Sequence, residues 1–131
     1  MAAINYSGLI IASKAVESDL DNYEEDDEDD KMLGTDKNNS KKYANIYYKP
    51  FSQYKNLKDW HYRLDLGENI ECVAIGTNWC AVYTDLNYVR VFSAEGIQKY
   101  IFCLSTPVVS MAAYENLLSI VYHSGPSLYG C

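Results

Sequence analysis

The side chains of this 131-residue chain with the most obvious chemistry are two histidines and four cysteines. Structural zinc sites usually contain two such ligands only about two to four residues apart in the sequence. No two of these six residues have that spacing, so the sequence predicts no metal site. The six residues are His61, Cys72, Cys80, Cys103, His123 and Cys131.

Acid–base or nucleophilic catalysis would need a carboxylate pair, or a histidine beside a nucleophile, on rigid elements. Outside one acidic segment the carboxylates are isolated in the sequence. His61 and His123 lie near expected strand ends, and we interpret His123 as a surface or packing residue there. No phosphate-binding glycine motif and no Gly-x-Ser-x-Gly is present. We therefore expect no catalytic residue, no cofactor and no enzyme activity.

Thirteen tyrosines and several lysines raise the alternative of DNA contact. Surfaces that bind single strands combine aromatic side chains for base stacking with positive charge. Tyrosine is also an ordinary strand residue, and this cluster is loosely spaced, so direct DNA contact stays an alternative. The lysines are Lys41, Lys42, Lys49, Lys55 and Lys58.

The net charge of −7 comes from one segment. Ten of the 18 acidic residues lie between Glu17 and Asp30, where there is no basic residue. Such a composition buries too little apolar surface to offset chain entropy, so we predict a disordered acidic loop over residues 16–42. This loop is either simply solvated or a docking segment for basic partners such as histones.

The elements that must position all these residues are short β-type runs at almost even intervals. Gly, Asn and Pro mark the breaks between them, and no helical segment intervenes. Spacing of roughly 8–12 residues favours a sandwich, barrel or propeller. The runs are Leu9–Ala12, Tyr43–Tyr48, Ile70–Ile75, Trp79–Thr84, Tyr88–Phe92, Ile97–Leu104, Val108–Tyr114 and Leu117–His123.

Several runs are apolar on both faces, including 80–82 and 100–104. We expect these strands to be covered on both sides, as strands in stacked propeller blades are. A propeller has four or more blades of about 40–45 residues each, so this chain holds about two. The predicted fold is all-β: an incomplete antiparallel β-propeller. Residues 1–15 supply one short strand, 16–42 the acidic loop, and 43–131 the rest of the partial propeller.

The N-terminus has neither a basic region nor a long apolar run. We therefore expect a reducing compartment, cytosol or nucleus, in which the cysteines are free thiols.

Six short segments and Thr84 carry a family resemblance, the segments being 67–70, 76–79, 90–92, 96–98, 107–112 and 121–125. In order and spacing they resemble the middle, SepB-type β-propeller of the chromosome-transmission-fidelity adaptor. This family is also called minichromosome-loss protein or, in animals, WD-repeat and HMG-box DNA-binding protein. The resemblance is close over residues 60–125 and looser over 43–59. The signature positions are Gly76, Trp79, Thr84, Arg90, Phe92, Gly96, Gln98, Pro107, Met111 and His123.

The resemblance implies a nuclear, non-enzymatic scaffold of the replisome that links the replicative helicase assembly to DNA polymerase alpha. It also implies a homotrimer for the full-length protein. Its signature positions have architectural tasks. The glycines serve tight turns, and Trp79 and Phe92 supply buried area. Pro107 sets the entry to the next strand, and Thr84 and Arg90 pair with backbone or carboxylate groups. Asn78 and Thr106 replace glycines expected in the family; Asn tolerates a left-handed turn, whereas Thr there is costlier.

Overall fold

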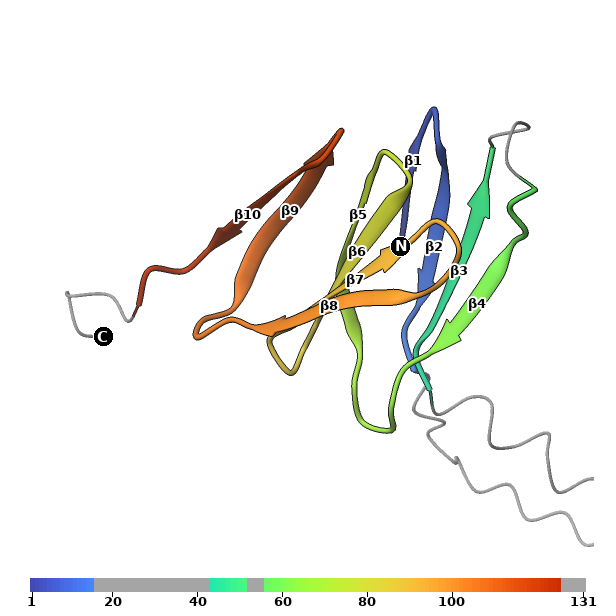
Figure 1. The fold of residues 1–131 in the computed structure, drawn as a ribbon. Helices are drawn as coiled ribbons and strands as arrows, with labels where there is room; N and C mark the ends of the chain where they lie inside the picture. Colours follow the sequence, from blue (N-terminus) through green and yellow to red (C-terminus); the bar gives the residue numbers. More distant parts are fainter. Residues whose placement is uncertain (16–42, 52–55, 126–131) are drawn as a thin grey trace, which may run out of the picture.

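The computed structural model describes residues 1–15, 43–51 and 56–125. These residues form ten strands, which make two four-stranded sheets and one two-stranded sheet, all antiparallel. Consecutive strands are neighbours in every sheet, as in a meander (Figure 1). The all-β fold of a partial propeller is confirmed. No helix in the described ranges has the length and hydrophobicity needed to cross a membrane.

The first sheet consists of β1 (Ala2–Asn5), β2 (Gly8–Ser13), β3 (Asn45–Pro50) and β4 (Trp60–Arg63). Residues 14–44 lie between two strands that pair directly, since Ser13 faces Asn45 across the ladder. The segment predicted to be a disordered acidic loop, 16–42, lies outside the described residues. It is therefore inserted between neighbouring strands of one sheet.

The second sheet consists of β5 (Ile70–Gly76), β6 (Trp79–Thr84), β7 (Tyr88–Ser93) and β8 (Gln98–Cys103). Its three turns each contain a residue with positive φ: Asn78 at 62°, Asn87 at 62° and Gly96 at 89°. The prediction that Asn78 occupies a left-handed turn is confirmed. Thr106 is not among the described residues with positive φ, so the expected cost of a threonine there does not arise.

The third sheet has only two described strands, β9 (Val108–Tyr114) and β10 (Leu117–Tyr122). Pro107 directly precedes β9, as predicted, where its missing N–H costs no ladder bond. Two residues, Glu115 and Asn116, connect the strands, and Glu115 has a positive φ of 49°.

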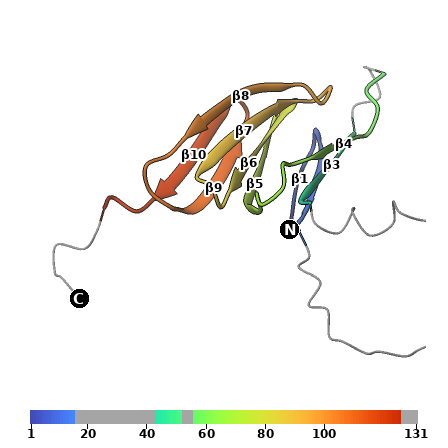
Figure 2. The same ribbon diagram turned by 90° about the horizontal axis from the view of Figure 1, so that it is seen from below.

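The three sheets stack face to face, with the second in the middle (Figures 1 and 2). Strand β5 lies against β1 and β2 on one side and against β9 on the other. One core, which includes Ile10, Tyr48 and Phe92, fills the space between the first and second sheets. A smaller core around Ala81, Tyr83 and Val89 joins the second sheet to the third. Each interface is thus built from the side chains of two neighbouring blades.

The run predictions agree with most of the strands, and two strands were missed. The bounds of β6 and β9 match the predicted runs, and β5, β7, β8 and β10 differ by one or two residues. Strands β1 and β4 were not predicted, because each has only four residues.

One burial prediction is wrong. The run 100–104 was expected to be covered on both faces, yet Tyr100, Ile101 and Phe102 in β8 are exposed. This strand is the outer edge of its sheet, and the two described strands of the third sheet do not reach across to it. In contrast, Cys80, Ala81 and Val82 in β6 are buried as predicted.

Candidate functional site

The signature residues gather at the junctions between sheets, where two tryptophans have matching roles. Trp79 begins β6, and its indole N–H donates to the carbonyl of Glu115 in the third sheet at 2.7 Å. Trp60 begins β4, and its indole N–H donates to the carbonyl of Ala94 in the second sheet at 3.0 Å. Each tryptophan therefore fastens its own sheet to a turn of the next.

Glycines make room for both indole rings. A Cβ on Gly76 would overlap the ring of Trp79, and a Cβ on Gly96 would come within 2.8 Å of Trp60 Cγ. Gly96 also has a φ of 89°, so it serves the turn as well as the ring. The sequence predicted both glycines as turn residues but gave no sign of the indole contacts.

A buried ion pair lies on the second sheet. Arg90 Nε and Nη2 donate to the two carboxylate oxygens of Glu68 at 3.0 and 2.8 Å, and Nη1 donates to Gln98 Oε1 at 3.0 Å. The side chains of Arg90 and Glu68 are only 10% and 2% exposed. Hydrogen bonding to Glu68 raises the pKa of Arg90 above its ordinary value, so the guanidinium stays charged. The bidentate geometry fixes the loop before β5 to strand β7.

Arg90 was expected to pair with a carboxylate or a backbone group, and the structure shows it paired with the carboxylate of Glu68. Glu68 itself was missed, since an acidic residue in a loop after Gly67 looks solvent-exposed. Thr84, predicted to pair with backbone or carboxylate groups, is fully buried, and its hydroxyl has no hydrogen-bond partner within the described ranges.

The other signature residues have packing or surface positions. Phe92 is fully buried in the larger core and contacts the rings of Trp60 and Tyr62. Met111 packs against the smaller core. His123, exposed after the end of β10, lies at a strand end as predicted, and its backbone N–H donates to the carbonyl of Pro107.

The turns on one end of the stack are joined by hydrogen bonds. The side-chain amide of Asn5 donates to the carbonyls of Ile75 and Gly76 at 3.3 and 3.0 Å. Thr77 N–H then donates to the carbonyl of Glu115 at 2.9 Å. A continuous chain of turn contacts thus runs from the first sheet through the second to the third. Sequence reasoning did not identify Asn5, because the strand it ends was not predicted.

Asn69 anchors the base of the acidic insertion at the opposite ends of these strands. Its side-chain oxygen accepts from the N–H of Ala15 at 2.9 Å, and its carbonyl accepts from the N–H of Asp85. Beside it, Lys14 forms an exposed ion pair with Glu71 at 3.3 Å. The last described residue before the insertion is therefore tied to the second sheet.

The described part of the chain holds no cluster of side chains of the metal-binding kind. There, no three His, Cys, Asp or Glu side chains are grouped to hold a metal ion. Cys72, Cys80 and Cys103 are free thiols, and burial raises the pKa of Cys80 to about 12. Cys80 is therefore a protonated core residue at neutral pH.

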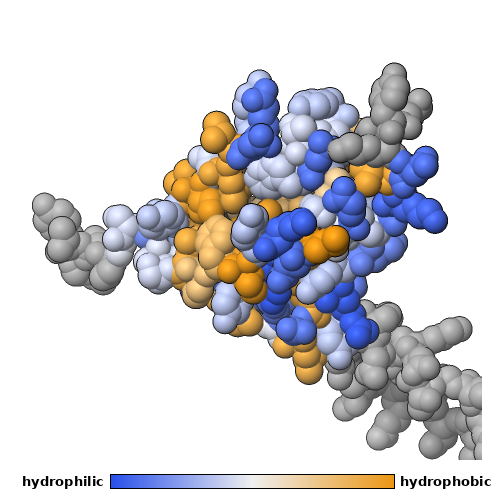
Figure 3. Space-filling view, viewed as in Figure 1, coloured by the Kyte–Doolittle hydropathy of each residue, from blue (hydrophilic) through white to orange (hydrophobic). Residues whose placement is uncertain are grey.

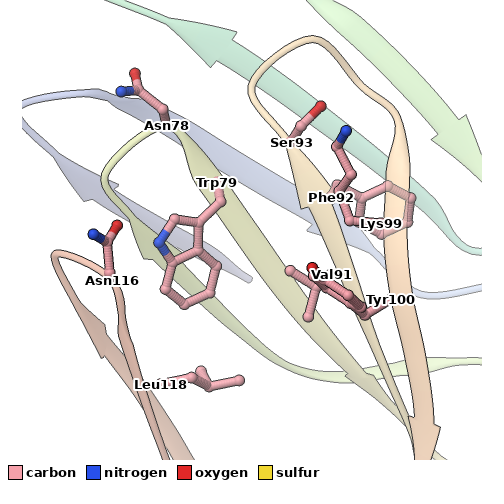
Figure 4. Close-up of a pocket in the computed structure, with 9 residues that line it drawn as sticks. All are labelled: Asn78, Trp79, Val91, Phe92, Ser93, Lys99, Tyr100, Asn116 and Leu118. Carbon is pink, nitrogen blue, oxygen red and sulfur yellow. The ribbon is translucent and has the colours of Figure 1, made fainter.

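A cavity of about 500 Å³ lies between the second and third sheets (Figure 4). Trp79, Val91, Tyr100 and Leu118 form its apolar wall, and the side chains of Asn78 and Asn116 come from the two neighbouring turns. Among the described residues that line it, Lys99 is the one with a charged side chain.

The sequence of the whole chain, residues 1–131, matches the family model for the middle region of minichromosome loss protein, Mcl1. The chain belongs to this family. The curated relatives that the chain matches are much longer than the chain itself. It is 40% identical over 80 residues to WD repeat and HMG-box DNA-binding protein 1 of Mus musculus and of Homo sapiens. Those 80 residues are 61% of this chain and 7% of each relative.

A plant protein is similar as well. The chain is 38% identical over 78 residues to Protein ENHANCER OF LHP1 1 of Arabidopsis thaliana, which covers 60% of this chain and 8% of the relative. The matched part is thus a small portion of each relative. Family membership agrees with the resemblance carried by the signature residues and with the propeller-type sheets that they join.

Proposed function

We propose that this Mcl1 middle region is a non-enzymatic scaffold segment in a nuclear replisome adaptor. The adaptor couples the replicative helicase assembly to DNA polymerase alpha during DNA replication. The observation that carries this proposal is the family match over residues 1–131. The name of the animal relatives, WD repeat and HMG-box DNA-binding protein 1, supports a role at DNA.

The architecture suits a scaffold. The signature residues Trp79, Arg90 and Gly96 all hold sheets or turns together, and none of them faces a site for chemistry. A scaffold needs a rigid platform from which attached segments reach their partners, and stacked blades supply one. In the full-length protein we propose a homotrimer, with direct DNA contact as a subsidiary role.

The test uses the full-length protein in a replication extract depleted of the endogenous one. Adding back the wild type should restore DNA polymerase alpha to replicating chromatin. Adding back Trp79→Ala, which removes the fastening to the third sheet, should restore it less well, whereas the surface variant Lys49→Ala should behave as wild type. If polymerase recovery needed no added protein at all, the adaptor role would be refuted.

A second candidate function concerns the acidic insertion as a docking segment for basic proteins such as histones. The observation that favours it is the anchored base: Ala15 is held by Asn69, and Ser13 pairs with Asn45. A segment of 27 residues, 16–42, with ten acidic side chains between Glu17 and Asp30, thus starts from a fixed place at the ends of the inner strands β2 and β3.

Deleting residues 17–30 tests this second function. Histone binding at low salt should fall strongly, and it should be restored by a shuffled sequence of the same charge but not by Asn and Gln replacements. Unchanged affinity after deletion would rule out the docking role. Scaffold activity in the extract should survive the deletion, so the two functions can be separated.

A further inference from the structure

Two leucines are exposed at the end of the stack to which the acidic insertion is attached. Leu66 is 67% and Leu86 is 50% exposed, and each follows an exposed aspartate, Asp65 or Asp85. Leu66 lies in the turn before β5 and Leu86 in the turn between β6 and β7, at the lower end of the molecule (Figure 1). Figure 3 shows hydrophobic and hydrophilic surface side by side at this end. The two turns thus combine apolar side chains with negative charge.

The turn that carries Leu66 is held at both of its ends. Leu64 is buried, and its N–H donates to the carbonyl of Ala44 in the first sheet at 2.9 Å. Glu68 is also buried and takes part in the ion pair described above. Between them, a Cβ added to Gly67 would meet no atom within 4 Å outside its chain neighbours. Leu66 is therefore exposed at the tip of a turn whose ends are fixed.

The turn that carries Leu86 is hydrogen-bonded to the first turn. The N–H of Asn69 donates to Asp85 Oδ1 at 2.8 Å, and the N–H of Asp85 donates back to the carbonyl of Asn69 at 2.9 Å. Asn87, with a φ of 62°, closes the turn by donating to the carbonyl of Thr84 at 3.0 Å. A partner that contacts both leucines therefore has little loop ordering to offset when it binds.

Both ends of the acidic insertion are attached to the turn that carries Leu66. The N–H of Ala15 donates to the side-chain oxygen of Asn69, and the carbonyl of Ala44 accepts from the N–H of Leu64. The first of the ten acidic residues is Glu17, two residues after Ala15 in the sequence. The chain thus leaves this turn and returns to it with a strong negative charge in between.

The charges of the described residues agree with this. Asp65 and Asp85 place two carboxylates next to the leucines in the sequence. Two cations adjoin the same end: Lys14 forms its ion pair with Glu71, and Arg63 lies over a tyrosine ring at 4.4 Å from the ring centroid. A partner with lysine or arginine beside apolar residues would complement both the charge and the exposed leucines.

We propose that Leu66 and Leu86 form an apolar docking surface for a basic protein segment that itself carries two apolar residues. Those residues cover the two leucines, while Asp65, Asp85 and the charge of the insertion attract the cationic side chains of the segment. The proposal rests on the docking role of the acidic insertion for the class of partner. Charge brings basic segments to this end of the stack, and contact with the leucines selects among them.

Fluorescence anisotropy with two labelled, lysine-rich peptides tests the proposal on the 131-residue chain at physiological salt. The peptides are identical except at two positions, which are leucine in one and serine in the other. The wild type should bind the leucine peptide at least about tenfold more tightly, because the peptide covers two exposed leucines. Equal affinity of the wild type for both peptides would overturn the proposal.

The double variant Leu66→Ser, Leu86→Ser should bind the two peptides equally. Both leucines are exposed, so this variant should unfold at the same urea concentration as the wild type. The matched control is Leu117→Ser, a change at a side chain that is 72% exposed on the third sheet, and it should keep the preference for the leucine peptide. A preference that survived in the double variant would contradict the assignment of the surface.

Deletion of residues 17–30 separates this surface from the docking role of the insertion. It should weaken the binding of both peptides and leave the ratio of their affinities unchanged. If it changed neither affinity, the insertion would have no docking role, and the loss of preference in the double variant would establish the leucine surface independently. A molar mass, measured by light scattering, that fell in the double variant would make a second copy of the chain the occupant and would overturn the proposal.

Discussion

The ion pair between Arg90 and Glu68 should stabilise the blade only as a pair. Replacing Arg90 by Met leaves the Glu68 carboxylate, whose side chain is 2% exposed, without a cationic partner. Loss of one partner from a buried, hydrogen-bonded pair costs about 3–5 kcal/mol. Replacing Glu68 by Leu leaves the guanidinium with its hydrogen bond to Gln98 but without a carboxylate partner, at a cost in the same range.

The double variant Glu68→Leu, Arg90→Met removes both charges and should cost far less than the sum of the single changes. Replacement of a buried ion pair by apolar groups is often neutral or stabilising, so the coupling energy should reach at least about 3 kcal/mol. Urea unfolding of the four proteins, with comparable m-values, measures it. The exposed pair Lys14–Glu71, whose side chains are 54% and 43% exposed, is the matched control, and its coupling should stay below about 1 kcal/mol. Additive costs at Glu68 and Arg90 would refute the reasoning, since they would mean that each charge is solvated without the other.

Three further predictions concern the glycines, a buried thiol and a turn. Gly76→Ala should lower the unfolding free energy by about 2 kcal/mol or more, because the new Cβ would overlap the Trp79 ring. The control is Gly67→Ala, whose Cβ would have no atom within 4 Å. It should cost only about 1 kcal/mol, because Gly67 has a positive φ. Burial raises the pKa of Cys80 from 9.0 to about 12, so the unfolded chain loses this proton first. The buried, protonated thiol therefore contributes a stability that is fully present below pH 9 and is lost as the pH rises toward 12, by about 1.4 kcal/mol per pH unit. Cys80→Ala should flatten the dependence of the unfolding free energy on pH, measured by urea unfolding, whereas Cys103→Ala should not. Asn5→Ala removes two donated hydrogen bonds and should cost about 1–2 kcal/mol in urea unfolding; a stability equal to wild type would show that water replaces them.

Much of this fold is predictable because strands of six or seven residues show their periodicity and end in Gly, Asn or Pro. Strands β6 and β9 have their predicted bounds for this reason. The four-residue β1 and β4 carry too few residues for a pattern, and they form because longer neighbours, β2 and β3, offer them a ladder. Local sequence does not contain that tertiary support.

The sequence indicated which residues matter at the junctions between sheets, but not which residues they contact. Gly76 and Trp79 lie three residues apart, so their packing is a local matter that spacing can suggest. Arg90 and Glu68 are 22 residues apart and meet only once β5, β6 and β7 have paired in one sheet. Asn5 and Ile75 are 70 residues apart and meet only because the first and second sheets stack. Sequence indicated that β8 was apolar, but exposure depends on how many strands its neighbouring sheet supplies.

The acidic insertion lies in the sequence between Ser13 and Asn45, two residues that face each other in one ladder. Because loop closure costs only about 0.6 kcal/mol more for each doubling of loop length, the blade is nearly indifferent to how long the segment is. Evolution can therefore lengthen, shorten or rewrite it without refolding the scaffold. The same place can accept a fluorescent protein whose termini lie close together, so that the Mcl1 middle region could be tracked in living cells with both of its ends left untouched.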